Sequence, residues 1–152
     1  MLPTQSWQIR QQYQKAERKK QVTRTALLVF MEKGIEQTTM NDVASRAAIG
    51  IASVYRYFKT KQELVIDSAS LFWQEEVRNL FTRHEQAFLP AATGLDRALG
   101  LLRIYLELYD GGKQFFSFIE QFDQFVLREG IEPGQLAEYD QTLLGIRTLF
   151  EK

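Results

Sequence analysis

The chain of 152 residues contains no cysteine, which excludes disulfide bridges and thiolate metal sites. No apolar run approaches the roughly 20 residues that a helix needs to span a bilayer. The first twenty residues are polar, become basic toward their end, and lack the apolar core of a signal peptide. These absences predict a cytoplasmic protein that does not enter a membrane.

Groups suited to catalysis are equally scarce. The single histidine, His84, lies near the end of an expected helix, where a surface or dipole-compensating role is more common than that of a general base. There is no glycine-rich phosphate loop and no spacing of His, Asp and Glu suited to a metal. The adjacent Glu75 and Glu76 point to different sides of a helix and form no acid–base pair. The sequence therefore predicts a protein that is not an enzyme and holds no metal or cofactor.

What is present is helical periodicity, with no strand-like alternation of useful length. We expect long helices over about 61–87, 94–109 and 113–129, and a further helix after Pro133. The expected stops are Pro90, Gly111-Gly112 and Gly130. The predicted fold is all-α.

The segment from Thr39 to Lys61 indicates two short helices joined by a tight turn. Thr39 and Asp42 have the spacing of a capping box, which starts a helix over about 40–47. Gly50 ends the turn, because glycine enters conformations that other residues avoid and serves as a weak N-cap. A second helix then begins near Ile51. This arrangement is that of a DNA-reading helix-turn-helix, although paired helices also occur in many all-helical cores.

The second helix of this pair divides into an inward and an outward face. Val54 and Phe58 are four residues apart and face inward. The residues that remain to point outward or sideways are Ala52, Ser53, Tyr55, Arg56 and Lys59. A guanidinium can bridge guanine O6 and N7 or clamp a phosphate, and phenol and ammonium groups suit phosphate oxygens. Lys61 opens the next helix, where its ammonium and the free N–H groups face one anion.

Charge is divided unevenly along the chain. Residues 1–61 contain eleven Lys and Arg against four acids, a net charge of +7, whereas the remainder carries −7. The overall charge of zero therefore conceals a basic front and an acidic back, as expected if only the front approaches a polyanion. The alternative is a solvated basic surface that has no partner.

Thr39 to Leu64 resembles the DNA-binding signature of the tetracycline-repressor (TetR) family of bacterial transcriptional regulators. The matching residues are Thr39, Val43, Ala44, Ala47, Ile49, Ser53, Tyr55, Tyr57, Phe58, Lys61 and Leu64. Residues 26–34 are similar to the family's first helix and its glycine stop, so the resemblance covers about residues 22–66. Ala48, Gly50 and Ala52 depart from the family pattern. If the turn needs a positive φ at position 48, alanine costs roughly 1 kcal/mol there.

The resemblance implies a ligand-responsive regulator, most often a repressor, that binds a two-fold DNA operator as a homodimer. A three-helix helix-turn-helix domain would occupy residues 1–66, and a helical effector-binding and dimerisation domain residues 67–152. The predicted DNA contacts are Thr39, Ser53, Tyr55, Arg56, Tyr57 and Lys61. Helical character is convincing only from about Lys15, so the preceding residues form either an extended basic arm that contacts DNA or a frayed terminus.

The second half is rich in aromatic residues, which either fill a core or wall a cavity for a flat apolar ligand. Phe115, Phe118, Phe122 and Phe125 follow the spacing of one buried stripe, with Phe116 to one side. Because family members bind effectors between helices here, the predicted ligand contacts are Phe72, Trp73, Tyr105, Tyr109, Phe118 and Phe122. Nearby acids that either hold a lipophilic cation or face water are Glu107, Glu120 and Asp123.

Family members usually continue past the point where this chain ends, and their last two helices form most of the dimer interface. A fragment or a short variant is therefore expected. The apolar positions available near the end are Leu143, Leu144, Ile146, Leu149 and Phe150. A different class of function also fits the pattern, namely a helical small-ligand carrier or a protein-interaction module with a basic surface.

Overall fold

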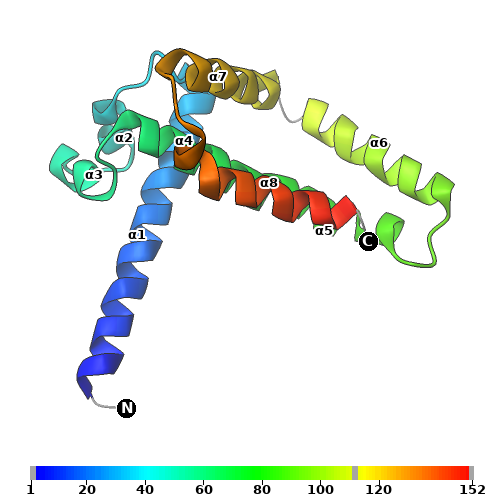
Figure 1. Cartoon of the computed structure of the whole chain (residues 1–152), viewed down its shortest axis with the longest axis horizontal. Coiled ribbons are helices and arrows are strands. Elements are labelled where there is room, and N and C mark those ends of the chain that lie inside the picture. The colour runs from blue at the N-terminus through cyan, green and yellow to red at the C-terminus, as the bar shows by residue number, and fades with distance from the viewer. Residues whose placement is uncertain (1–2, 111–112, 151–152) are drawn as a thin grey trace.

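The computed structural model describes residues 3–110 and 113–150, and its regular elements in these ranges are all helical (Figure 1). The α-helices are α1 (Pro3–Lys33), α2 (Met40–Arg46), α3 (Ile51–Tyr57), α4 (Lys61–Phe72), α5 (Arg78–Arg83), α6 (Gly94–Asp110), α7 (Lys113–Glu129) and α8 (Ala137–Phe150). A π-helical turn, η1 (Trp73–Val77), joins α4 to α5, and short 3-10 helices occupy η2 (Glu85–Phe88) and η3 (Pro133–Leu136). The all-α prediction is confirmed.

Several predicted helix boundaries agree with the structure. The helices expected over 94–109 and 113–129 correspond to α6 and α7. Helix α7 ends at Glu129, and the next residue, Gly130, has a φ of +60°, the left-handed conformation that closes a helix. The helix expected over 61–87 is instead interrupted by η1 and ends at Arg83, before Pro90 is reached. The predicted Gly111-Gly112 stop lies outside the described residues.

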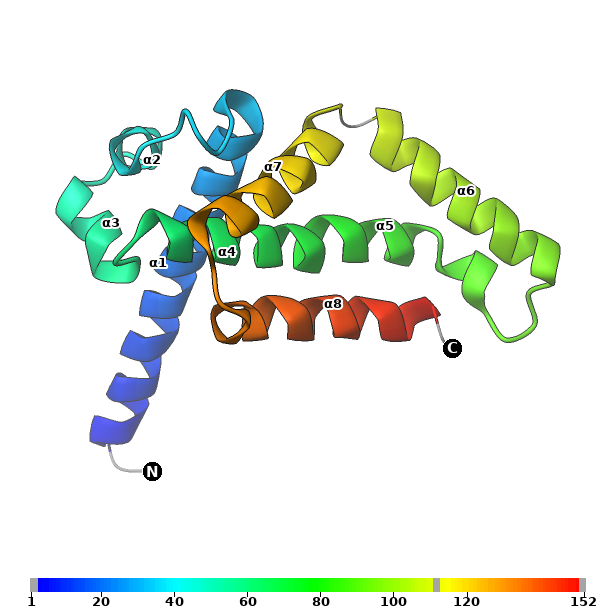
Figure 2. The same cartoon turned by 45° about the horizontal axis from the view of Figure 1, so that its top comes forward.

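The N-terminal segment is neither an extended arm nor a frayed end. A single helix of 31 residues, α1, begins at Pro3. Proline is favoured in the first helical turn, and no glycine or further proline interrupts the chain before Gly34. The first half of α1 projects away from the rest of the molecule (Figures 1 and 2), and every side chain from Ser6 to Arg18 is exposed.

The second half of α1 forms a core with α2, α3 and the start of α4. Phe30, Ile35, Val43, Val54 and Phe58 are fully buried within it. The apolar side chains of these elements thus converge on one centre, which fixes α3 against α1. Since α4 passes through residue 66 without a break, the predicted domain boundary at that point stays a prediction.

The other half of the molecule is organised around α4, η1 and α5. Helix α8 runs alongside them, α7 crosses near α4, and α6 lies at the far end (Figure 2). The indole N–H of Trp73 donates to the Tyr139 hydroxyl at 3.1 Å, and the Tyr139 ring lies 4.9 Å from that of Phe122. None of the described helices combines the length and apolarity of a bilayer-spanning segment.

Helix α7 is tied directly to the loop that follows α1. The side-chain oxygen of Gln121 accepts a hydrogen bond from the backbone N–H of Ile35 at 2.9 Å. Arg128 forms an ion pair with Glu36 in the same loop. Near the end of α7, Glu129 accepts a hydrogen bond from Gln62 at 3.1 Å. The C-terminal half of α7 therefore braces the helix-turn-helix against the rest of the chain.

Candidate nucleic-acid interface

The start of α2 is fixed by the predicted capping box. The backbone N–H of Thr39 donates to the Asp42 carboxylate at 2.7 Å, and the Asp42 N–H donates to the Thr39 hydroxyl at 3.2 Å. Lys33 pairs with the same carboxylate at 2.8 Å. Hydrogen bonds from Lys33 and from the Thr39 N–H and hydroxyl hold the pKa of Asp42 well below its usual range. Thr39 is consequently locked at the exposed end of α2.

The turn between α2 and α3 requires a positive φ at Ala48, which has a φ of 53°. The backbone N–H of Ile49 donates to the carbonyl of Ala44 at 3.1 Å and stabilises this conformation. Gly50 has φ −67° and ψ 146°, an extended conformation that any residue adopts. The conformational freedom attributed to Gly50 is therefore not used; the strained position is Ala48.

Helix α3 presents its outer face to solvent, as predicted. Val54 and Phe58 lie in the core, with exposures of 0% and 1%. Tyr55 is 50% exposed, and Arg56 is exposed beside it. Ser53 and Tyr57 are half-buried along the side that faces α1. The structure thus brings four of the six predicted DNA contacts together on α3.

Lys61 is placed differently from these four residues. Thr60 caps α4 by accepting the backbone N–H of Glu63 at 3.1 Å. The Lys61 ammonium donates to the carbonyl of Glu36 at 3.3 Å, and partial burial lowers its pKa despite the nearby Glu36 and Glu129 carboxylates. Lys61 therefore links the start of α4 to the loop before α2, and its contact with DNA stays a prediction.

The basic residues of the first 61 positions fall into two groups. Those that form ion pairs with the body of the protein are Lys19, Lys20, Arg24, Lys33 and Arg46, paired with Asp67, Glu75, Glu75, Asp42 and Glu32. Those that form no ion pair within residues 3–110 and 113–150 are Arg10, Lys15, Arg18, Arg56, Lys59 and Lys61. Most of the uncompensated positive charge therefore lies on α3 and on the free half of α1.

The sequence predicted an extended basic arm or a frayed end before Lys15 and missed the helical face that α1 adds to this surface. Gln11, Gln14, Lys15 and Arg18 line a cleft of about 460 Å³ together with Arg56 and Tyr57 of α3. Their spacing of three, four and seven residues puts them on one helix face. That spacing and the uninterrupted run from Pro3 to Gly34 were the signals that could have predicted this polar face of α1.

The predicted effector contacts lie in two environments. Phe72, Phe118 and Phe122 are buried in the core, and the rings of Phe72 and Phe118 are 6.1 Å apart. Trp73 is half-buried. Tyr105 and Tyr109 stack on the exposed surface of α6 with their ring centres 6.5 Å apart. The predicted stripe on α7 is buried at Phe118, Phe122 and Phe125, whereas the Phe115 side chain lies outside the described residues.

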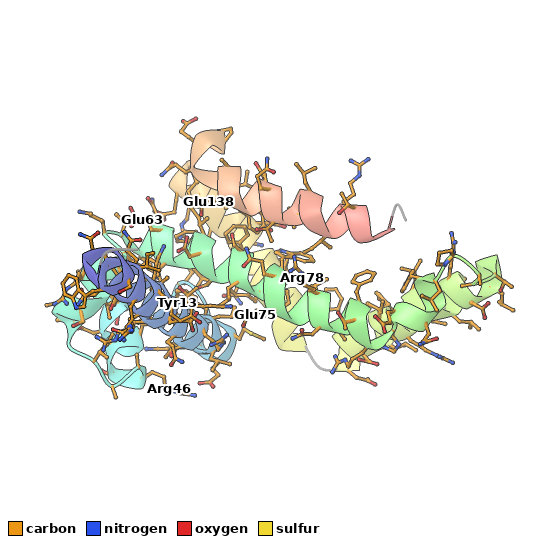
Figure 3. The ribbon with its side chains drawn as sticks, turned by 90° about the horizontal axis from the view of Figure 1, so that it is seen from below. Tyr13, Arg46, Glu63, Glu75, Arg78 and Glu138 are labelled. Atoms are coloured by element: carbon orange, nitrogen blue, oxygen red, sulfur yellow. The ribbon has the colours of Figure 1, made fainter. Side chains whose placement is uncertain are left out.

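The described clefts are lined by other side chains. A cleft of about 640 Å³ separates α8 from η1 and α5, and Figure 3 labels Glu75 and Arg78 on one side of it and Glu138 on the other. Within the described ranges, the clefts of about 640, 300, 440 and 460 Å³ include none of the six predicted aromatic residues. An effector site formed by those six residues therefore stays a prediction.

His84 lies at the end of α5, near a helix end as the sequence predicted, and its pairing with a second helix was not expected. Its Nε2 lies 2.6 Å from the Glu107 carboxylate, which also pairs with Arg83 at 3.2 Å. This contact joins the end of α5 to α6. No group of three or more potential metal ligands was found among the described residues.

Comparison with known proteins agrees with this geometry. The family model of bacterial regulatory proteins of the tetR family matches residues 22–67, which include α2, α3 and the second half of α1. The HTH-type transcriptional repressor KstR2 of Mycobacterium tuberculosis is 30% identical over 142 residues, an alignment that covers 77% of this chain and 68% of that protein.

Two further relatives extend the comparison. KstR2 of Mycolicibacterium smegmatis is 28% identical over 122 residues, and the alignment covers 72% of this chain but only 57% of the relative. The HTH-type transcriptional regulator LuxR of Vibrio harveyi is 34% identical over 79 residues, with 52% of this chain and 34% of that protein covered. No solved structure gives a significant match to the chain.

Proposed function

The chain belongs to the TetR family of bacterial regulatory proteins, and we propose from this that it binds DNA in the cytoplasm as a ligand-responsive transcriptional repressor. The observation that carries the proposal is the exposed outer face of α3, beside which the unpaired cations gather. Two relatives named as transcriptional repressors support repression rather than activation.

In the proposed complex, α3 enters the major groove of a duplex. Ser53, Tyr55 and Arg56 then lie nearest the bases and phosphates, because Val54 and Phe58 hold the opposite face in the core. Thr39 and Lys61 flank α3 at the starts of α2 and α4 and are the remaining proposed phosphate contacts. A homodimer would set two such helices about one helical turn apart on a two-fold operator.

The effector acts through the helices that support α3. A small apolar or lipophilic molecule bound among the aromatic residues would move α4, which connects directly to the reading helix through Phe58 and Thr60. For release to follow, the effector must bind the form that does not bind DNA more tightly, since equal affinity for both forms shifts nothing.

Selection of bound sequences from a random duplex pool, repeated with candidate effectors, tests the proposal. A repressor of this kind enriches a two-fold sequence, and its affinity falls steeply as salt rises. Arg56→Ala should cost about 1 to 3 kcal/mol at particular base pairs if Arg56 reads them, and an equal loss on all duplexes would make it a phosphate contact. A ligand carrier or protein-interaction module would enrich no sequence.

A further inference from the structure

We propose that the cleft between α1 and α3 binds a backbone phosphate of the DNA that α3 reads, so that the free half of α1 is a second DNA-binding element. This inference rests on the proposed function and names a further part of its interface. The ligand is a phosphodiester of the duplex, located beyond the base pairs that α3 itself covers.

The geometry of the cleft supports this assignment. It has a volume of about 460 Å³ and is lined by Lys15 and Arg18 from α1 and by Arg56 from α3. The other lining residues, Gln11, Gln14 and Tyr57, carry amide and phenol groups that also donate hydrogen bonds. An adjoining cleft of about 440 Å³ shares Arg18, Arg56 and Tyr57, so these residues border both clefts.

The positive charge of the cleft is not neutralised by an acidic side chain within it. No carboxylate lines it among the described residues, and the nearest acid along α1, Glu17, borders the adjoining cleft instead. Lys19 and Lys20, the residues that follow Arg18, turn toward the body and pair with Asp67 and Glu75 at 2.7 Å and 2.8 Å. One face of α1 thus neutralises the protein's own acids. The other face contributes Lys15 and Arg18, which together with Arg56 of α3 give the cleft three unpaired cations that suit an anion.

The helical state of α1 makes the site preorganised. Lys15 and Arg18 are held on one side of a continuous helix whose second half is buried against α2 and α4. Binding a phosphate there orders side chains only, whereas a flexible basic arm would also lose backbone entropy. A rigid helix also fixes the distance from α3 to the extra contact, which places the bound phosphate at a constant position outside the recognised sequence.

The test measures the salt dependence of duplex binding for matched charge variants of the full chain. Lys15→Gln and Arg18→Gln remove cations of the cleft. Lys20→Gln and Arg24→Gln remove the same charges from the same helix, but each leaves Glu75 with its other basic partner. All four variants should retain the circular dichroism spectrum and melting profile of the wild type, because the side chains lie on the exposed surface of α1.

The double variant Lys15→Gln/Arg18→Gln should lower the salt slope by about 1, which makes the loss of affinity between 50 and 200 mM salt about fourfold smaller. The Lys20 and Arg24 variants should keep the wild-type slope. Replacing single phosphates of the duplex by neutral methylphosphonates then locates the contact. One such replacement outside the selected base pairs should weaken the wild type and leave the double variant unaffected.

Equal reductions of the salt slope in all four single variants would show that the positive charges of α1 act only through their sum. That result would refute a phosphate site in the cleft. Unchanged slopes at Lys15 and Arg18, with normal binding of the selected duplex, would refute the second element and leave the proposed function intact. If the wild type binds no duplex at all, the proposed function fails and this inference falls with it.

Discussion

At the scale of single residues, the turn between α2 and α3 contains a residue whose backbone conformation is unfavourable for its type. Ala48 occupies the left-handed region with a φ of 53°, which a Cβ atom disfavours. The conformation persists because the core residues on both sides, Ala44 and Val54, fix the path of the chain.

Ala48→Gly should therefore stabilise the protein by about 0.5 to 1 kcal/mol, since the removed strain exceeds the added freedom of the unfolded chain. Thermal or urea unfolding measures this change. Ala47→Gly is the control, because Ala47 has a φ of −77° and should lose stability with glycine. A lower melting temperature for Ala48→Gly would show that the turn is not strained.

The capping box gives a second prediction at this scale, one that depends on pH. The folded-state pKa of Asp42 lies below its unfolded value, so its carboxylate stabilises the fold above pH 4 and loses this effect as the pH falls toward the folded pKa. Asp42→Asn should lower the melting temperature at pH 7, and the difference from the wild type should shrink progressively below pH 4. A difference that is independent of pH would mean that the carboxylate charge has no part in the cap.

At the scale of elements, much of the helical plan is predictable from local signals. Gly130 and the capping box of Thr39 set boundaries that hold in the structure, because caps and stops act within one turn of the chain. The early start of α1 was missed because its exposed half has no apolar stripe. The π turn at Trp73–Val77 contacts α8, which is distant in the sequence. The α1–α3 cleft needs both elements in place and has no local signature.

The contact between α7 and the loop after α1 provides the prediction at this scale. Gln121 is the side chain that accepts the N–H of Ile35, so Gln121→Ala leaves a part-buried donor without that acceptor. The substitution should destabilise the protein by about 1 to 3 kcal/mol. Gln124→Ala is the matched control, since Gln124 is exposed on the same helix. Equal denaturant midpoints for the two variants would show that the hydrogen bond between Ile35 and Gln121 contributes nothing to the stability of the fold.

At the scale of the whole molecule, the division into a basic front and an acidic back acquires a structural meaning. Lys19, Lys20 and Arg24 of α1 form ion pairs with Asp67 and Glu75 of the acidic part, whereas Lys15 and Arg18 line the cleft beside α3. Although partial burial opposes it, hydrogen bonds from Arg24 and Lys20 lower the pKa of Glu75, so this junction is ionised at neutral pH. A sum of charges along the sequence could not separate these two roles.

The outward face of α6 is where we expect the second subunit of the proposed homodimer to dock. The apolar residues exposed there recur at the 4, 3, 4, 3 spacing of a two-helix seam and are Leu95, Leu99, Leu102, Leu106 and Tyr109. Gly100 and Ile104 are buried on the opposite face, so the seam points away from the protein.

Leu102→Glu places a charge at the centre of this seam, where burial of an unpaired carboxylate is strongly unfavourable. Light scattering after gel filtration should change from a dimer to a monomer, with the circular dichroism spectrum preserved because Leu102 is already 51% exposed in the single chain. Leu144→Glu is the control, since Leu144 is similarly exposed on α8. A dimer that survives Leu102→Glu but dissociates with Leu144→Glu would assign the interface to α8, the position first suggested by the apolar residues near the end of the sequence.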